Sequence, residues 1–181
     1  MKKNAFELGI IVGRFQVLHR GHVYMIRKAL QVCSEVAVFI GSSQESGTMK
    51  NPLSYEMRAD LLHTALPDVK IYPLADIGIG NNNKWGDYVL ENAMQRCGSL
   101  PDLIISGMEE RRADWINEKW MIAELSVPKI IDISATRMIR YMIDDERDKW
   151  EQYIDPAIAD RYDEIRQQVL LSRDRLETMS I

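Results

Sequence analysis

The sequence predicts an α/β fold: a parallel sheet of about five strands with helices on both faces, followed by a C-terminal helical segment. Short apolar runs recur along the chain, and segments with helical periodicity lie between them. Because strands that alternate with helices usually form a parallel sheet covered by those helices, this order predicts the fold class.

The apolar runs are short, and several are rich in β-branched residues. Loop-forming residues follow most of them, which is typical of buried strands. The predicted strands are residues 8–12, 36–40, 69–72, 103–105 and 129–131.

Three segments between or after these runs predict helices. The first carries an apolar stripe, the second follows Ser54 as an N-cap, and the third begins with Asp155 as a cap and Pro156 in its first turn. The stripes are Val23, Ile26, Leu30 and Cys33; Leu61, Leu62, Ala65 and Leu66; and Ile158, Tyr162, Ile165 and Val169.

With 181 residues, of which 46% are hydrophobic, the chain has the size of one domain. We divide residues 1–181 into an α/β core (1–132) and a segment of motif and C-terminal helices (133–181). The net charge of −4 argues against general nucleic-acid binding. No apolar run is long enough for a membrane span, and Cys33 and Cys97 suggest no disulfide framework, so we expect a cytoplasmic protein.

Ligands of open parallel sheets bind at the carboxyl ends of the strands, and the first predicted strand ends in an unusual segment. Gly13 allows close backbone approach to a ligand, and Gly21 relieves crowding at the start of a helix. Arg14, His19 and His22 add donors beside this helix start, where phosphate binding is favoured. Zinc would need a third ligand, and the remaining histidine, His63, has no supporting pattern, so we expect no metal site.

Residues 13–16 (GRFQ) and 19–22 (HRGH) resemble two signatures of the HxGH nucleotidyltransferase superfamily. The best match within it is to the archaeal-type and bacterial bifunctional-type nicotinamide mononucleotide (NMN) adenylyltransferases. The resemblance implies a Rossmann-like enzyme that transfers AMP from ATP to NMN, forming NAD and pyrophosphate. It also implies nucleotide contacts for Gly13, Phe15, Gln16 and Gly21.

Residues 41–52 form a polar loop after the second strand, and they resemble the GSxQxS loop of the same family. The resemblance implies substrate contact at Ser43 and a phosphate contact at Lys50. Residues 76–85 are rich in asparagine and end in Trp85. They lack the third glycine of a dinucleotide fingerprint, and the family pattern implies that Asn82 and Trp85 surround the nicotinamide ring; the alternative for Trp85 is core packing.

Two later segments follow the fourth and fifth predicted strands. Ser106 and Gly107 resemble a turn that lies near the adenosine, and the charged residues 109–112 after it fit a solvated face better than a substrate contact. Residues 133–140 resemble the family's ISxTxxR motif, with Ser134 as a helix N-cap. The motif implies nucleotide contacts for Ile133, Ser134 and Thr136, and we add Arg137 to these candidates.

The usual arginine of this motif would fall at Ile139, whereas arginine stands here at Arg137 and Arg140. Either one is a candidate for the phosphate clamp. The implied catalytic set is His19 and His22 as transition-state donors, with Arg14, Lys50 and Arg140 (or Arg137) as clamps.

Adenylyl transfer depends mainly on positioning and on neutralising phosphate charge, which suits a site rich in donors and cations. Mg²⁺ bound to ATP is expected from this chemistry, although the sequence shows no dedicated ligand set for it.

Two other functions remain as alternatives to NMN adenylyl transfer. One is the same chemistry on another acceptor: phosphopantetheine, FMN or, with CTP, a polyol phosphate. The other is a non-catalytic nucleotide-binding module. A homo-oligomer is compatible with the resemblance.

Overall fold

The computed structural model describes residues 4–78, 82–107, 116 and 118–179, with the backbone alone at residues 82, 118 and 175–179. Strands and helices alternate up to the last strand, after which the chain continues as helices. The strands are β1 (Phe6–Gly13), β2 (Cys33–Ile40), β3 (Lys70–Pro73), β4 (Leu103–Gly107) and β5 (Ala123–Val127). The helices are α1 (Arg20–Val32), α2 (Tyr55–Ala65), α3 (Asn82–Cys97), α4 (Ala135–Ile143), α5 (Arg147–Glu151) and α6 (Tyr162–Met179), with the short 3₁₀ helices η1 (Glu118–Trp120) and η2 (Pro156–Arg161).

The five strands form one parallel sheet in the order β3-β2-β1-β4-β5. The central strand β1 pairs with β2 along its length and with β4 between Gly9↔Leu103 and Ile11↔Ile105. The strand order reverses between β1 and β4, so the connections after these two strands leave the sheet in opposite directions. Such a point opens a crevice at the carboxyl ends of the strands.

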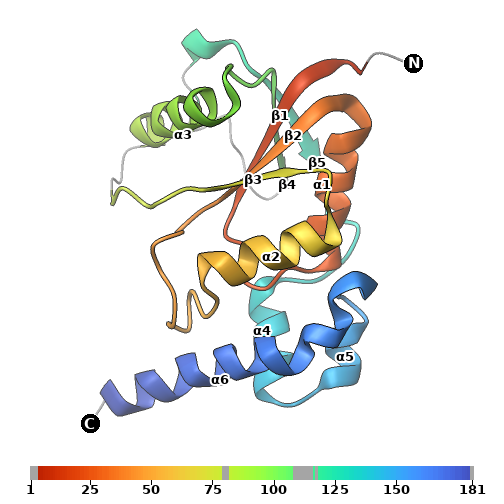
Figure 1. Ribbon diagram of the computed structural model, residues 1–181, viewed down its shortest axis with the longest axis vertical. Helices are drawn as coiled ribbons and strands as arrows, with labels where there is room; N and C mark the ends of the chain where they lie inside the picture. Colours follow the sequence, from red (N-terminus) through yellow and green to blue (C-terminus); the bar gives the residue numbers. More distant parts are fainter. Residues whose placement is uncertain (1–3, 79–81, 108–115, 117, 180–181) are drawn as a thin grey trace.

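Helices cover both faces of the sheet (Figure 1). The adjacent residues Ile10 and Ile11 of β1 belong to different core clusters, as the two-residue period of a strand requires. Ile10 packs in the cluster that includes Val89 and Leu90 of α3, whereas Ile11 packs in the cluster that includes residues of α1, α2 and the C-terminal helices. The predicted Rossmann-like sheet with a C-terminal helical segment is thus confirmed.

The prediction of the fifth strand was wrong: the strand is β5 at Ala123–Val127, and residues 129–131 lie in the loop after it. β5 is an edge strand that pairs only with β4, and most of its residues are exposed, including Glu124 and Ser126. An apolar run marks a strand that is buried on both faces, so it does not identify a half-exposed edge strand. The apolar residues of the loop have another role, described below.

The predicted helix caps are confirmed. Ser54 Oγ accepts a hydrogen bond from Met57 N at 3.3 Å, and Ser134 Oγ accepts one from Arg137 N at 3.3 Å. Asp155 Oδ1 accepts from Ala157 N at 3.1 Å, although the helix that it caps is first a 3₁₀ turn, η2, and only then α6. In the first predicted stripe, Cys33 belongs to β2 and not to the preceding helix.

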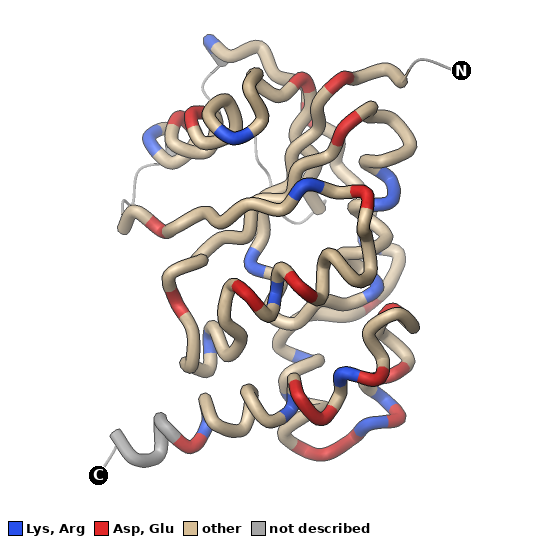
Figure 2. The backbone as a smooth tube through the Cα atoms, viewed as in Figure 1, with Lys and Arg blue, Asp and Glu red and all other residues tan. Residues whose placement is uncertain are grey.

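Figure 2 shows that positively and negatively charged residues are interspersed along the described part of α4, α5 and α6. Many of them form ion pairs with near neighbours, such as Arg147 with Glu151 and Lys149 with Glu146. Exposed pairs of this kind contribute little to stability, about 0–1 kcal/mol each. Within the described residues, no helix combines the length and the apolarity that crossing a bilayer would require.

Candidate functional site

A cavity of about 450 Å³ lies at the carboxyl ends of β1, β4 and β5. The last residues of these strands line it: Gly13 of β1, Gly107 of β4 and Val127 of β5. It therefore occupies the crevice that the reversal of strand order opens between β1 and β4, where ligands of such sheets bind.

The start of α1 forms one wall of the cavity, and both of its histidines line it. His19 is the N-cap of this helix, and its Nδ1 accepts a hydrogen bond from His22 N at 3.4 Å. The two imidazole rings are stacked, with centroids 3.7 Å apart and an interplanar angle of 16°. The predicted convergence of the two side chains follows from this arrangement, with His19 just before the helix and not within its first turn.

Burial keeps both histidines neutral. It lowers the pKa of His19 to about 4, and the positive charge of Lys129 acts in the same direction. Burial likewise lowers the pKa of His22 well below its ordinary value, and the neighbouring His19 adds to the effect. Nδ1 of His22 is buried and has no hydrogen-bond partner among the described residues.

Two glycines in this wall are needed because side chains approach them closely. A Cβ at Gly21 would lie 3.1 Å from Cε1 and Nδ1 of His19, and a Cβ at Gly13 would lie 3.1 Å from the ring of Phe15. Phe15 is buried, adopts a φ of 54°, and meets the His22 ring edge-on at 5.0 Å. The glycines and Phe15 therefore fix where the imidazoles lie.

Hydrogen bonds tie the β1–α1 loop to the β2–α2 loop. The side-chain amide of Gln16 donates to Leu53 O at 3.0 Å and accepts from Leu53 N at 2.9 Å. Both ends of this amide thus bind backbone, although Gln16 also lines the cavity. On the same side, Arg14 and Lys50 line the cavity with exposed side chains, and Arg14 Nη1 lies 3.5 Å from Lys50 O.

Arg58 of α2 reinforces this link from inside the protein. Its side chain is fully buried and donates four hydrogen bonds to carbonyl oxygens, those of Arg14, Gly41, Ser42 and Ser54. Burial lowers its pKa to about 10, so the guanidinium remains charged at neutral pH. The motif interpretation missed Arg58. Its position in the apolar stripe with Leu61, Leu62 and Ala65 is the sequence signal that would have identified it.

The start of α4 forms the facing wall. Ile133, the N-cap Ser134, and Thr136 of the first turn all line the cavity, so the N-termini of α1 and α4 both open into it. Helix N-termini carry free N–H groups and partial positive charge, which favour anions. The loop before α4 adds Lys129 and the apolar residues Ile130 and Ile131.

Several predicted residues do not line the cavity. Ser43 donates its backbone N–H to Leu74 O, and Ser106 Oγ donates to Glu124 Oε1 at 3.1 Å. Trp85 packs against Tyr88 in the α3 core cluster, the alternative considered for it from the sequence. The side chain of Asn82 and the charged residues 109–112 lie outside the described part of the chain.

Neither candidate arginine of α4 lines the cavity. Arg137 Nη1 lies 2.8 Å from Asp132 O and 3.3 Å from Asp132 Oδ2, and Arg140 Nε lies 3.5 Å from Asp144 Oδ2. The cavity contains Ile139 at this point of the helix. The sequence interpretation also missed Lys129, because it assigned residues 129–131 to a strand.

The described residues that line the cavity carry a net positive charge: they include three cations (Arg14, Lys50 and Lys129) and no aspartate or glutamate. Together with two helix N-termini and two neutral imidazoles, it offers an anion several donors from opposite sides. The apolar residues on the loop before α4 offer a surface for a less polar group. This combination suits a phosphate-bearing nucleotide.

Comparison with known proteins agrees with this reading. The sequence model of the family described as "Cytidylyltransferase-like" matches residues 10–139 of this chain. The nicotinamide-nucleotide adenylyltransferase of Thermococcus kodakarensis is 30% identical over 167 residues, which cover 87% of this chain and 83% of the relative. That of Aeropyrum pernix is 32% identical over 167 residues, covering 86% and 90%.

Among solved structures, the chain resembles a bifunctional NMN adenylyltransferase/ADP ribose pyrophosphatase from Francisella tularensis. The TM-score is 0.76 at 23% identity, with 97% of this chain and 55% of the other covered. A second structure of that bifunctional protein, complexed with AMP and a manganese ion, gives a TM-score of 0.73 at 22% identity and covers 96% and 54%. The chain thus spans about half the length of these two structures, and at this identity the likeness establishes the fold.

Proposed function

Because the chain belongs to the cytidylyltransferase-like family of nucleotidyltransferases, we propose that it transfers AMP from ATP to NMN, forming NAD and pyrophosphate. The observation that carries the proposal is the cavity between the N-termini of α1 and α4, with its stacked histidines and its cations. The names of the archaeal relatives and the AMP bound in the Francisella structure support the choice of substrates.

In the proposed reaction, a phosphate oxygen of NMN attacks the α-phosphorus of ATP. The new O–P bond forms as the bond to the bridging oxygen between the α- and β-phosphates breaks, and pyrophosphate leaves with the electron pair. Negative charge spreads over the transferring group, so groups that stabilise it in the transition state accelerate the step. No protein nucleophile takes part.

His19 and His22 supply such groups in this proposal. A neutral imidazole carries one N–H, and because Nδ1 of His19 accepts from the His22 backbone, the proton of His19 is on Nε2. The His19 ring can therefore donate to a phosphate, and we assign the same role to His22, while Arg14 and Lys50 bind the phosphates from the β1 and β2 side. We assign nucleotide contacts to Gly13, Gly107, Ser134 and Thr136 as well.

Mg²⁺ enters this proposal as part of the substrate, MgATP. The described lining residues provide no carboxylate, and no cluster of three or more metal-ligating side chains occurs among the described residues. Mg²⁺ commonly keeps several waters and binds through substrate phosphates, so the nucleotide can carry it into the cavity.

We place the enzyme in the cytoplasm, where its two free thiols, Cys33 and Cys97, would remain reduced.

The test is an acceptor screen with the purified protein. With MgATP and NMN, we expect NAD and pyrophosphate to form in equal amounts. Parallel reactions contain phosphopantetheine or FMN with MgATP, and a polyol phosphate with MgCTP. Turnover with one of these but not with NMN would reassign the acceptor, and no pyrophosphate with any pair would reject the transfer reaction in favour of a nucleotide-binding module.

A further inference from the structure

The cations that line the cavity are unevenly distributed. Among the described lining residues, Arg14 and Lys50 come from the loops after β1 and β2, and their contact through Lys50 O places them together. Lys129 alone comes from the other side, the loop between β5 and α4. A triphosphate carries negative charge along its whole length, so a cation on the second wall would attract it from the side opposite Arg14 and Lys50.

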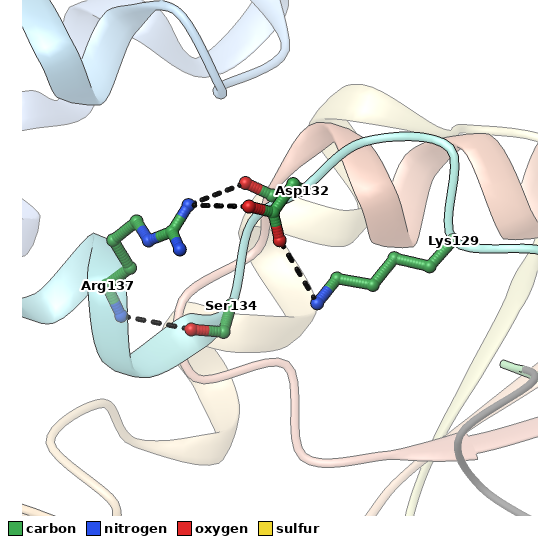
Figure 3. Close-up of polar contacts among 4 residues, drawn as sticks. All are labelled: Lys129, Asp132, Ser134 and Arg137. Carbon is green, nitrogen blue, oxygen red and sulfur yellow. Dashed lines mark hydrogen bonds and ion pairs between the residues drawn. The ribbon is translucent and has the colours of Figure 1, made fainter.

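The environment of Lys129 fits this role (Figure 3). Its Nζ lies 3.5 Å from Asp132 Oδ1, and the other oxygen of that carboxylate lies 3.3 Å from Arg137 Nη1. The Asp132 side chain is 80% exposed, so this ion pair is well solvated and weak. Breaking this ion pair so that the ammonium group can meet a phosphate would therefore cost little.

The charge of Lys129 also acts across the cavity on the wall formed by the start of α1, because it helps to lower the pKa of His19. No arginine of α4 occupies the same place: Arg137 binds Asp132, Arg140 has a side chain that is 81% exposed beside Asp144, and Ile139 faces the cavity. The facing wall thus receives its side-chain cation from the loop and not from the helix.

We propose that Lys129 binds the phosphate chain of the nucleoside triphosphate from the β5–α4 side, opposite Arg14 and Lys50. This inference rests on the proposed function and adds to it a specificity-determining residue for the triphosphate. Asp132 holds the lysine side chain near the cavity in the absence of nucleotide and exchanges it for phosphate when nucleotide binds.

The test compares four variants with the wild type. Lys129→Met removes the charge and keeps the length of the side chain, and Lys129→Arg keeps a cation. Asp132→Asn removes the partner of the ion pair and leaves the lysine. Lys149→Met is the matched control, because Lys149 also forms an exposed ion pair three residues away, with Glu146, but lies on α5.

We expect Lys129→Met to raise the KM for MgATP and the Kd for ATP and for pyrophosphate by about 10-fold, the loss typical of one hydrogen bond to a charged group. The KM for NMN and the Kd for AMP should change less than twofold. Lys129→Arg should restore most of the affinity, and Lys149→Met should match the wild type. Asp132→Asn should leave the KM for MgATP unchanged or lower it.

Two results would overturn the assignment. If Asp132→Asn weakened ATP binding as much as Lys129→Met, the lysine would act only through the ion pair. If Lys129→Met weakened NMN or AMP as much as ATP, it would contact a different phosphate. Calorimetric ATP binding needs no acceptor, so the role of Lys129 is tested even if the wild type makes no NAD, an outcome that would reject only the proposed acceptor.

Discussion

At the scale of single residues, the neutral state of His19 has a consequence for stability. The folded chain holds this ring with a pKa of about 4, whereas an unfolded chain would titrate near 6.5. Between these two values the unfolded chain binds a proton that the folded chain does not, so stability falls as pH falls from about 6.5 to about 4 and then levels off. His22 acts in the same direction.

The variant His19→Asn should reduce this pH dependence, because asparagine keeps an N-cap acceptor and does not titrate. From the pKa difference, His19 accounts for about 3 kcal/mol of the decline in the free energy of unfolding. Urea unfolding at pH 7, 5.5 and 4.5 measures it. Identical declines in the variant and the wild type would show that the His19 ring is not held neutral in the fold.

His22 is the second residue whose role can be isolated. If His22 donates a hydrogen bond that stabilises the transition state, His22→Ala should lower kcat by roughly 10²–10³-fold. The control is His63→Ala, because His63 is exposed near the end of α2 and does not line the cavity. Turnover of the folded His22→Ala protein at the wild-type rate would remove this histidine from the mechanism.

At the scale of elements, Arg58 makes α2 part of the site. Its guanidinium joins the end of β1, the end of β2 and the N-cap of α2 through four carbonyl oxygens. Replacing it by Arg58→Met would leave buried carbonyls without donors, at a cost of about 1–3 kcal/mol for each one that water cannot reach. We therefore expect a loss of about 3 kcal/mol or more in the free energy of unfolding.

The same variant should raise the KM for MgATP, since Arg14 and the loop that carries Lys50 would lose a shared anchor. Chemical unfolding and steady-state kinetics measure the two effects. Arg96→Met is the control, because Arg96 is an exposed arginine near the end of α3. If Arg58→Met unfolded with the wild-type free energy, the buried hydrogen bonds would not be anchoring the loops.

Elements also show what the sequence can and cannot predict. Strands β1, β2 and β4 carry apolar runs because both faces of the sheet are covered there, and the caps Ser54, Ser134 and Asp155 are set by local hydrogen bonds. Strand β5 could not be found in this way, because most of its residues are exposed and only Val127 is buried, so its sequence carries no apolar run.

The same distinction holds in the site. His19, Gly21 and His22 lie within four consecutive residues at the start of α1, so their spacing along the chain already determines that they converge. Lys129 reaches the cavity only through the path of the β5–α4 loop, and Arg58 only through the packing of α2 against two strand ends. Arg137 shows the converse: the sequence makes it a candidate phosphate clamp because it lies near the motif position, but a local carboxylate, Asp132, binds its side chain.

At the scale of the whole molecule, the cavity depends on parts that are distant in sequence. The β1–α1 wall comes from the first quarter of the chain, and the α4 wall from the last third. The segment after α4 packs back onto the same core cluster as β1 and β2, through Ile158, Tyr162, Ile165 and Val169. Figure 1 shows α6 running below α2, with α4 and α5 beside it. The C-terminal helices therefore support the facing wall from behind.

This arrangement predicts that the α/β core and the C-terminal helices unfold as one unit. Ile165 is fully buried in the shared cluster, so Ile165→Ala should cost about 2–5 kcal/mol. In hydrogen exchange measured by mass spectrometry, amides of β1 and β2 should lose as much protection as those of α6. The control is Leu171→Ala, at a 46% exposed position of the same helix. It should change the free energy of unfolding by no more than about 0.5 kcal/mol and leave the protection of both sets of amides unchanged. Loss of protection confined to α6 would mean that the C-terminal segment opens on its own, and the α4 wall would then lack the rigid support that binding phosphates from two sides requires.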